Sequence, residues 1–394
     1  MEPLDLGAAL RAAQAADPAS LPDILLRTAA GLDATDVVVY LVDFAQTTLE
    51  PVPDRSTHAE LPQTEEVATT MAGRAFVSQE AMTAERPGGV RLWVPIVEGS
   101  DRTGVLAVTV PVATDALVAA VEELGLLAGS LLATQARATD VYNLYRRRRS
   151  LSLAASMQWD LLPPLVLKTD RITIACLLEP AYEVGGDSFD YALNDSVFNI
   201  GVIDGMGHGV GAALIAALTI GSYRHDRREA RTLEDTHANL DRVMATHFPQ
   251  AFATGQLAQI DVDTGAMTWT NAGHPCPLLI RGGRVIRQLA CAPTPPWGLG
   301  SLRSDPTEVA TEALEPGDSI LFYTDGVVEA QLPGGEQFGV DRLADLAGQH
   351  ATEQLEPEEI VRQIVRSVID HQDHELTDDA TIALVHWDGP ATSP

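Results

Sequence analysis

The sequence of 394 residues contains a single lysine, Lys168, and its other 25 basic residues are all arginines. It therefore has no Gly-Lys-Ser/Thr run of the kind that forms a P-loop, and Lys168 is the only side chain that could form a Schiff base. Basic residues are scarce overall: 26 of them stand against 55 acidic ones, which leaves a formal net charge of −29. This deficit argues against a nucleic-acid partner or an anionic membrane surface.

Cysteine and long apolar runs are also scarce. Cys176, Cys276 and Cys291 are odd in number and lie at no metal-ligand spacing, which is typical of free thiols in a reducing compartment. No unbroken apolar run approaches the ~18–20 residues that a membrane span needs. The beginning of the chain, Met1-Glu2-Pro3, lacks the basic and apolar segments of a signal peptide. We therefore expect a cytoplasmic protein without a membrane span.

The acidic excess is uneven along the chain. Residues 1–150 carry 12 basic and 20 acidic side chains, whereas residues 151–394 carry 14 and 35. An excess of this size either forms a solvated face or holds cations. With 45% hydrophobic and 21% charged residues, the composition is that of a globular protein with two or three domains.

After an N-terminal segment at 1–20, residues 21–114 predict a small α+β domain. A short helix is expected at 21–31, followed by strands rich in β-branched residues. The strands are expected at 37–43, 49–52, 91–97 and 104–110.

Residues 115–162 predict a helical linker, because they contain no proline and are rich in helix formers. Apolar or small residues recur at spacings of four and three, which indicates either a dimeric coiled coil or a helix packed on its own domain. These residues are Leu117, Val121, Leu124, Ala128, Leu131, Ala138, Tyr142 and Tyr145. Pro163 and Pro164 end the helix.

Residues 163–388 predict a second α+β domain, and residues 389–394 form a polar tail. The helices are inserted in blocks and do not alternate singly with strands, which favours an α+β sandwich over a doubly wound sheet. The strands are expected at 171–178, 197–203, 255–261, 266–271, 277–281, 319–323 and 380–387. The helices are expected at 209–229, 233–247, 340–350 and 357–371.

Acidic residues stand in glycine-rich or polar turns at the ends of these strands. They are Asp187, Asp204, Asp325 and the pair Asp378-Asp379. Hard divalent cations prefer oxygen ligands, and a glycine beside an aspartate lets a carbonyl, here that of Gly205, approach an ion. Any one Asp-Gly pair is more often a simple turn. Four such turns after apolar strands together favour a site for two metal ions.

The chain from Ala155 onward resembles the SpoIIE-like (RsbU-like) bacterial branch of the metal-dependent PPM, or protein phosphatase 2C-type, serine/threonine phosphatases. The motifs that carry the resemblance match in order and spacing over some 230 residues. They are Gln158–Pro163, Glu179–Asp187, Asp204–Ala213, Phe252–Thr254, Asn271–Pro275, Leu314–Asp318, Phe322–Glu329, Phe338–Gly339 and Asp378–Thr381.

The resemblance implies an αββα sandwich that binds two, in some members three, Mn²⁺ or Mg²⁺ ions. It also implies hydrolysis of phosphoserine or phosphothreonine on a regulatory protein, an anti-sigma factor antagonist, by a water activated between two metals. Carried over residue by residue, the metal ligands and catalytic residues are Asp187, Asp204, Asp325 and Asp378, with the Gly205 carbonyl as a further metal ligand. Asp379 is the alternative to Asp378, since neighbouring strand residues point in opposite directions.

Other residues in these motifs are less clearly assigned. Glu183 and Asp190 are candidates for supporting or structural roles. His208 and His274 invite a general-acid role, although His274 lies in a tight turn where fixing the backbone is the simpler function. Ser188-Phe189 departs from the aromatic pair frequent in such proteins, which puts the pocket wall in doubt but leaves the metal aspartate intact.

Residues 21–114 resemble a GAF sensor domain. The relevant segments are Val37–Phe44, Ala72–Phe76, Leu92–Ile96 and Gly104–Leu106. In proteins of this layout the front domain regulates the phosphatase through the connecting helix. The resemblance therefore implies a small-molecule or protein signal, with Gln158 and Leu161-Leu162 where the linker docks and a homodimer through the linker helix.

Two other functions compete with a regulated phosphatase. One is a catalytically silent sensor or partner-switching scaffold that uses the phosphatase fold for binding, and the intact aspartate set argues against it. The other is a metal-dependent phosphodiesterase acting on a nucleotide, although no base-binding signature is evident. Cys276 and Arg281 are one residue too close for a cysteine-phosphatase loop, and there is no Gly-x-Ser-x-Gly nucleophile motif.

Overall fold

The computed structural model describes residues 4–53, 62–179, 182, 185–292, 294–302, 307–331, 335–353, 355–372 and 378–390. The chain forms two compact units, Met1–Ser150 and Leu151–Pro394. Each unit has hydrophobic cores of its own. We call them the N-terminal and C-terminal units and describe them separately.

The N-terminal unit is built on one antiparallel sheet with the strand order β3-β2-β1-β6-β5-β4. Its strands are β1 (Asp36–Val42), β2 (Thr48–Val52), β3 (Glu65–Glu66), β4 (Met82–Arg86), β5 (Gly89–Glu98) and β6 (Asp101–Val110). Apolar residues alternate between its two faces. In β1, Val39 and Leu41 join one core while Val38 and Tyr40 join the other.

Helices cover both faces of this sheet. They are α1 (Leu6–Ala15), α2 (Leu21–Ala29) and α4 (Asp115–Gln135) on one face and α3 (Met71–Ser78) on the other. The four strands expected from the sequence are present. The sequence reading missed α1, which lies inside the supposed N-terminal segment 1–20, as well as α3 and β4.

The segment 115–162 is not one linker helix. Helix α4 ends at Gln135 and is followed by a short 3-10 turn, by α5 (Val141–Tyr145) and by α6 (Leu153–Leu161). The apolar stripe predicted for a coiled coil is buried within the N-terminal unit, where Val121, Leu124 and Leu131 join the core that α4 forms with the sheet. Of the two alternatives, the helix packed on its own domain is correct. The unit boundary accordingly lies at residue 150 and not at the ends of a 115–162 linker.

Among the described residues, one helical segment, Asp115–Ala138, is long and apolar enough by length and composition to cross a membrane. The search for unbroken apolar runs missed it, because Glu122 and Glu123 interrupt the sequence. Its most apolar stretch is 44% buried inside the protein. Since Val121, Leu124 and Ala128 pack in the core of the N-terminal unit, we interpret α4 as a core helix.

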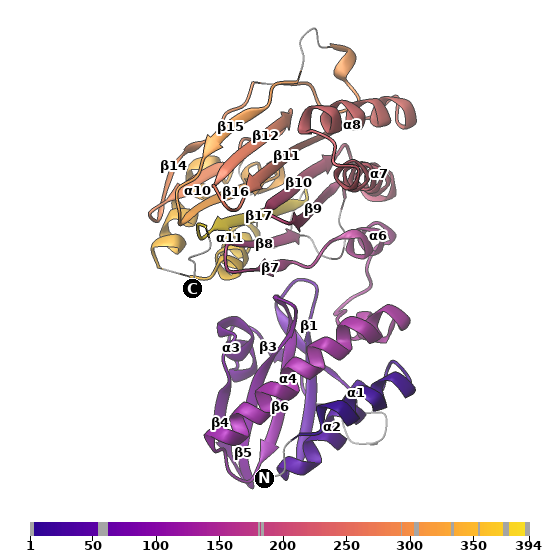
Figure 1. The fold of residues 1–394 in the computed structure, drawn as a ribbon, viewed down its shortest axis with the longest axis vertical. Coiled ribbons are helices and arrows are strands. Elements are labelled where there is room, and N and C mark those ends of the chain that lie inside the picture. Colours follow the sequence, from indigo (N-terminus) through magenta and orange to yellow (C-terminus); the bar gives the residue numbers. More distant parts are fainter. Residues whose placement is uncertain are drawn as a thin grey trace. The chain divides into compact units, whose positions relative to one another are not determined.

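The C-terminal unit stacks two antiparallel sheets between two layers of helices (Figure 1). The first sheet has the order β15-β12-β11-β10-β9 and the second β14-β13-β16-β17-β8-β7. Helices α7 and α8 pack on β9–β12 of the first sheet, and α10 and α11 pack on the second. This is the αββα sandwich that the family resemblance implied.

All seven strands and four helices expected in the C-terminal unit are present, but the sequence reading missed β7, β9, β14, β15 and α9. The strands of the first sheet are β9 (Asp187–Asn194), β10 (Val197–Gly205), β11 (Ala253–Asp261), β12 (Ala266–Ala272) and β15 (Ala310–Ala313). Those of the second are β7 (Val166–Lys168), β8 (Ile172–Glu179), β13 (Leu278–Arg281), β14 (Arg284–Gln288), β16 (Asp318–Tyr323) and β17 (Ala380–Trp387). The helices are α7 (Gly209–Arg228), α8 (Leu233–His247), α9 (Asp325–Val328), α10 (Val340–Thr352) and α11 (Pro357–His371).

Candidate metal centre

Two of the predicted aspartates meet at one end of the first sheet. Asp187 is the first residue of β9, and Asp204 lies next to the last residue of β10. The antiparallel register places Asp204 directly opposite Asp187. Asp187 is buried and only 2% exposed.

The second sheet brings the other aspartates to the same place. Asp325 opens α9 directly after β16, and Asp378-Asp379 directly precede β17, the strand paired with β16. The Thr324 hydroxyl joins the two sheets, since it donates a 2.6 Å hydrogen bond to Oδ2 of Asp187 and accepts one of 2.9 Å from the Thr381 amide.

The neighbours Asp378 and Asp379 take different positions. Asp379 is buried, and its Oδ2 accepts hydrogen bonds from the amides of Gly185 at 2.6 Å and Asp187 at 3.3 Å. It therefore holds the backbone of the loop that leads into β9. Asp378 is exposed, and its Oδ1 accepts the amide of Asp379 at 2.9 Å.

Two glycines allow these segments to approach closely. A Cβ at Gly326, next to Asp325, would lie 1.9 Å from the Asp379 carbonyl oxygen. A Cβ at Gly186 would lie 1.8 Å from the carbonyl oxygen of Gly205. The glycines beside the aspartates are thus required by backbone packing, whatever the carbonyl of Gly205 binds.

The carboxylates of the cluster strongly influence one another. Burial, reinforced by the charges of Asp204 and Asp379, raises the pKa of Asp187 well above its ordinary value. Burial and the charges of Asp325 and Asp378 raise the pKa of Asp204 to about 7. Burial also raises the pKa of Asp379 to about 6 and, together with Asp378, raises the pKa of Asp325. The structure therefore brings all five predicted aspartates into one electrostatic cluster.

The donor set fits hard divalent cations. In the described part of the chain, no arginine or lysine forms an ion pair with any of the five aspartates. Like charges that raise one another's pKa are stabilised by a cation. Within the same residues no group of three or more Asp, Glu, His or Cys side chains is close enough together to hold one metal ion. Mg²⁺ keeps several waters and takes few protein ligands.

His274 supports the cluster through a hydroxyl group. Its Nδ1 lies 2.9 Å from the Thr254 hydroxyl, which in turn lies 3.4 Å from Oδ2 of Asp204. Asn271 fixes the turn, because its side chain bonds both the amide and the carbonyl of His274. Burial lowers the pKa of His274 to about 4, so its imidazole is neutral at pH 7. We therefore expect this ring to position the Thr254 hydroxyl and not to act as a general acid.

The other candidates lie at varied distances from the cluster. His208 is exposed at the N-cap of α7, and its side chain makes no capping hydrogen bond. Ser188 is buried, and Phe189 belongs to the main core of the C-terminal unit. Asp190 is held in ion pairs by Arg224 and Arg227 and is thus structural. Glu183 lies outside the described residues.

The sequence reading missed Thr324 and Thr254 and placed Gln158 differently. Gln158 lies on α6, is 1% exposed, and donates to the carbonyls of Gly185 at 3.2 Å and Asp187 at 2.7 Å. Both threonines lie inside motifs that carry the family resemblance, Phe252–Thr254 and Phe322–Glu329. Membership in these motifs is the sequence signal that could have identified them.

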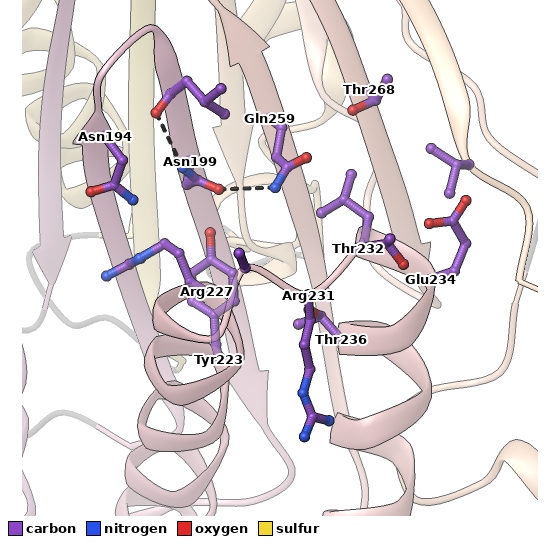
Figure 2. Close-up of a pocket in the computed structure, with 14 residues that line it drawn as sticks. Asn194, Asn199, Tyr223, Arg227, Arg231, Thr232, Glu234, Thr236, Gln259 and Thr268 are labelled. Carbon is purple, nitrogen blue, oxygen red and sulfur yellow. Dashed lines mark hydrogen bonds between the residues drawn. The ribbon is translucent and has the colours of Figure 1, made fainter.

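A separate cavity of about 540 Å³ lies at the other end of the same strands (Figure 2). It is lined by Asn194, the last residue of β9, and Val197, the first of β10, whereas Asp187 and Asp204 lie at the opposite ends. Figure 2 shows Asn199 and Gln259 on the strands across from Tyr223 on α7. This cavity is therefore not part of the aspartate cluster.

Residues 194–388 match the family model of stage II sporulation protein E (SpoIIE). The phosphoserine phosphatase RsbU of Bacillus subtilis is 25% identical over 242 residues, which cover 60% of this chain and 70% of RsbU. The C-terminal unit belongs to the SpoIIE-like branch of the PP2C-type serine/threonine phosphatases. The prediction of this family from the sequence motifs is confirmed.

Solved structures agree with this SpoIIE-like assignment. The RsbU and RsbW domains of Rv1364c from Mycobacterium tuberculosis align with a TM-score of 0.50 and 25% identity, over 56% of this chain and 61% of that one. The SiaA-PP2C domain of Pseudomonas aeruginosa shares the fold with a TM-score of 0.51 and 22% identity, over 60% of this chain and 94% of that one.

The matches leave much of some relatives uncovered. Protein IcfG of Synechocystis is 25% identical over 269 residues, which cover 61% of this chain but only 42% of IcfG. The SpoIIE family match itself begins within the C-terminal unit. The activity and partners of the whole chain are therefore taken up as proposals.

Proposed function

We propose that this chain is a protein phosphatase that depends on Mn²⁺ or Mg²⁺ and hydrolyses a phosphoserine or phosphothreonine on a regulatory protein. By the family resemblance, the substrate is an anti-sigma factor antagonist. One observation carries the proposal: buried carboxylates from both sheets raise one another's pKa, and within the described residues they have no arginine or lysine partner. Positive charge from a bound ion is therefore needed to keep these carboxylates ionised at neutral pH.

Asp187, Asp204, Asp325, Asp378 and the carbonyl of Gly205 would hold two divalent ions. When bound, such ions lower the pKa of a water molecule and offset the charge of the phosphoryl group. The protein's own residues orient the ligands. Thr324 fixes the Asp187 carboxylate by a hydrogen bond of 2.6 Å, and Thr254 lies beside that of Asp204.

Asp379 has a positioning role in this proposal. Its hydrogen bonds to the amides of Gly185 and Asp187 engage one carboxylate oxygen with the loop before β9. We therefore assign the metal-ligand role to the exposed Asp378 and the loop-holding role to Asp379.

A direct test follows hydrolysis of p-nitrophenyl phosphate and of a serine-phosphorylated anti-sigma factor antagonist. We expect activity on both substrates with Mn²⁺ or Mg²⁺, loss in EDTA and recovery when the metal is restored. Full activity in EDTA would refute the proposal. Failure to bind metal in calorimetry would instead favour the catalytically silent scaffold, and turnover of cyclic nucleotides alone would favour a phosphodiesterase.

We further propose that the N-terminal unit is a GAF-like sensor that regulates this site in the cytoplasm. The support is the position of α6, the first helix of the C-terminal unit after the boundary at residue 150. Its Gln158 donates hydrogen bonds to the carbonyls of Gly185 and Asp187, so a shift of α6 would move the backbone around Asp187 directly.

Comparing full-length protein with residues 151–394 tests the regulatory proposal. The shorter form retains the cores of the C-terminal unit. We expect the metal-dependent rate to differ several-fold between the two forms in either direction. Equal rates and equal metal affinities would exclude regulation by the N-terminal unit while leaving the phosphatase proposal intact.

A further inference from the structure

Exposed apolar side chains line one face of α7, directly beside the aspartate cluster. Met206, Val210 and Leu214 are 46%, 41% and 46% exposed. Val210 and Leu214 are four residues apart in α7 and therefore lie on one side of the helix, and Met206 lies in the turn that precedes it. The opposite side is buried, since Ile215 and Ile220 pack in the core beneath α7 and α8. We call Met206, Val210 and Leu214 the α7 stripe.

The stripe lies in a charge-free part of a highly acidic unit. Residues 151–394 contain 35 acidic and 14 basic side chains. Between Asp204 and Arg224, however, no Asp, Glu, Lys or Arg occurs. The turn and helix that carry the stripe therefore add no negative charge of their own that would repel a phosphorylated partner.

The surface between the cluster and the stripe is open. Cβ atoms added to Gly207, Gly209 and Gly211 would meet no atom within 4 Å, and His208 between them is exposed. A partner can therefore approach the backbone closely at these glycines. Large apolar side chains exposed together in this way mark an interaction site more often than isolated ones do.

We propose that the α7 stripe is the docking surface for the folded protein that carries the phosphorylated residue. Met206 stands two residues after Asp204, and Val210 and Leu214 lie in the first two turns of α7, about 6 Å apart along the helix axis. A phosphoserine that reaches Asp204 brings the surface around it over this stripe. The matching patch on the substrate is apolar and lies close to its phosphorylated side chain. This inference rests on the proposed phosphatase function.

The test uses the full chain with Val210→Gln and Leu214→Gln together. Glutamine suits an exposed helix position, so the helix is expected to be retained. Three substrates are compared with Mn²⁺: the folded, serine-phosphorylated anti-sigma factor antagonist, a short phosphoserine peptide cut from it, and p-nitrophenyl phosphate. Ile286→Thr on β14 and Leu302→Gln are matched controls, because both side chains are exposed apolar groups that lie outside α7.

We expect kcat/KM for the folded phosphoprotein to fall at least about tenfold in the double variant, through KM. The peptide and p-nitrophenyl phosphate should be hydrolysed within about twofold of the wild-type rate. Both control variants should match the wild type on all three substrates.

Other outcomes would overturn the proposal. An unchanged kcat/KM for the folded phosphoprotein would exclude docking on the stripe, and the proposed function would stand if p-nitrophenyl phosphate is still hydrolysed. An equal loss on all three substrates would show that the variant disturbs the metal centre instead. A change only in self-association, measured by sedimentation, would assign the stripe to a contact between copies of the chain.

A wild-type protein inactive on every substrate would refute the proposed function. Docking would then be judged by fluorescence anisotropy of the labelled antagonist. Weaker binding in the double variant would still support the stripe, and equal binding would refute it.

Discussion

Asp187 and Asp190 stand three residues apart on β9, and each is about 2% exposed. Asp190 forms ion pairs with Arg224 at 2.6 Å and with Arg227 at 2.8 Å. Asp187 instead accepts a hydrogen bond from Thr324 and faces other carboxylates. Two buried carboxylates on one strand therefore differ: Asp190 has arginine partners within the chain, whereas Asp187 has no Arg or Lys ion-pair partner among the described residues.

Under the proposed function, this difference separates a structural charge, Asp190, from a metal-binding one, Asp187. A buried charge destabilises the fold unless it is paired. Removing one partner of a buried pair destabilises the protein more than replacing both partners by apolar residues. Asp190 carries its counter-charge within the fold. The Asp187 cluster has no such partner among the described residues, and in the proposed function divalent cations supply its counter-charge. Mutations at the two positions should consequently have opposite effects on activity and stability.

The largest expected effect is on catalysis at the cluster. Asp187→Asn or Asp204→Asn should lower kcat/KM for p-nitrophenyl phosphate by about 10³-fold or more, because metal ions supply several kcal/mol of transition-state stabilisation. Circular dichroism should show the wild-type fold. Activity within tenfold of the wild type in either variant would contradict the assignment of the ligands.

Asp190→Ala should act on stability instead. It leaves the charges of Arg224 and Arg227 without their buried partner, which costs about 3 kcal/mol. For a unit of roughly 240 residues this lowers Tm by about 10 °C. Metal-dependent activity per folded molecule should stay near the wild-type value at low temperature.

A compensated variant makes the Asp190 prediction sharper. Replacing Asp190, Arg224 and Arg227 together by leucine or methionine removes both signs of charge and should recover most of the lost stability. A single Asp190→Ala variant as stable as the wild type, or one that loses catalysis without losing stability, would place Asp190 in the metal centre instead.

A smaller effect is expected at Thr324, which joins the two sheets at Asp187. Thr324→Val removes its hydrogen bonds to Asp187 and to the Thr381 amide. Partners that orient metal ligands typically contribute 10- to 100-fold to metal affinity, so we expect calorimetry to show binding about tenfold weaker.

Thr270→Val is the matched control for Thr324→Val. Thr270 is fully buried on β12, and its hydroxyl has no hydrogen-bond partner within the described residues. Metal affinity should therefore not change in this variant. Equal losses in both variants would mean that general packing, and not the orientation of Asp187, is measured.

The sequence motifs located the cluster because the ends of apolar strands are readable in the sequence. Asp204, Asp325 and Asp378 each adjoin a strand that was expected from its apolar pattern, and adjacent strands bring their ends together. Asp187 was found through its glycine-rich motif, because β9 itself was not predicted. The bounds of α8 and α11 could also be predicted, since both helices have an apolar face and a start signal, Thr232 as N-cap of α8 and Pro357 at the start of α11.

Other features could not be read from the sequence in this way. The apolar stripe of α4 suits a coiled coil and a core helix equally well, and only the burial of Val121 and Leu124 decides between them. Which of Asp378 and Asp379 is buried depends on the hydrogen bonds that Asp379 makes with the distant Gly185 loop. The arginines that neutralise Asp190 lie more than 30 residues along the chain, at a distance that no local pattern reveals.

The smallest expected effect is a pH dependence of stability in the metal-free protein. The pKa of Asp204 is raised to about 7 and that of Asp379 to about 6, from an ordinary value of 3.8. Folding therefore favours their protonated forms, and this stabilisation is complete below about pH 4 and is lost as the pH rises through 6 to 7. His274, with its pKa lowered to about 4, acts in the opposite sense, but mainly below pH 6.5.

Between pH 6 and pH 8 the carboxylates should therefore dominate, and the Tm in EDTA should fall by about 3 °C, equivalent to roughly 1 kcal/mol. Asp204→Asn should reduce this fall, and it should raise the metal-free Tm at pH 8 because it removes a repelled charge. Added Mn²⁺ should stabilise the wild type more at pH 8 than at pH 6, since protonation competes with metal for the same oxygens. Differential scanning fluorimetry of the wild type and Asp204→Asn, with and without Mn²⁺, measures the change of Tm with pH, the metal-free Tm at pH 8 and the stabilisation by metal. If the wild type and Asp204→Asn had the same pH dependence in EDTA, Asp204 would be neutralised from within the chain, as Asp190 is.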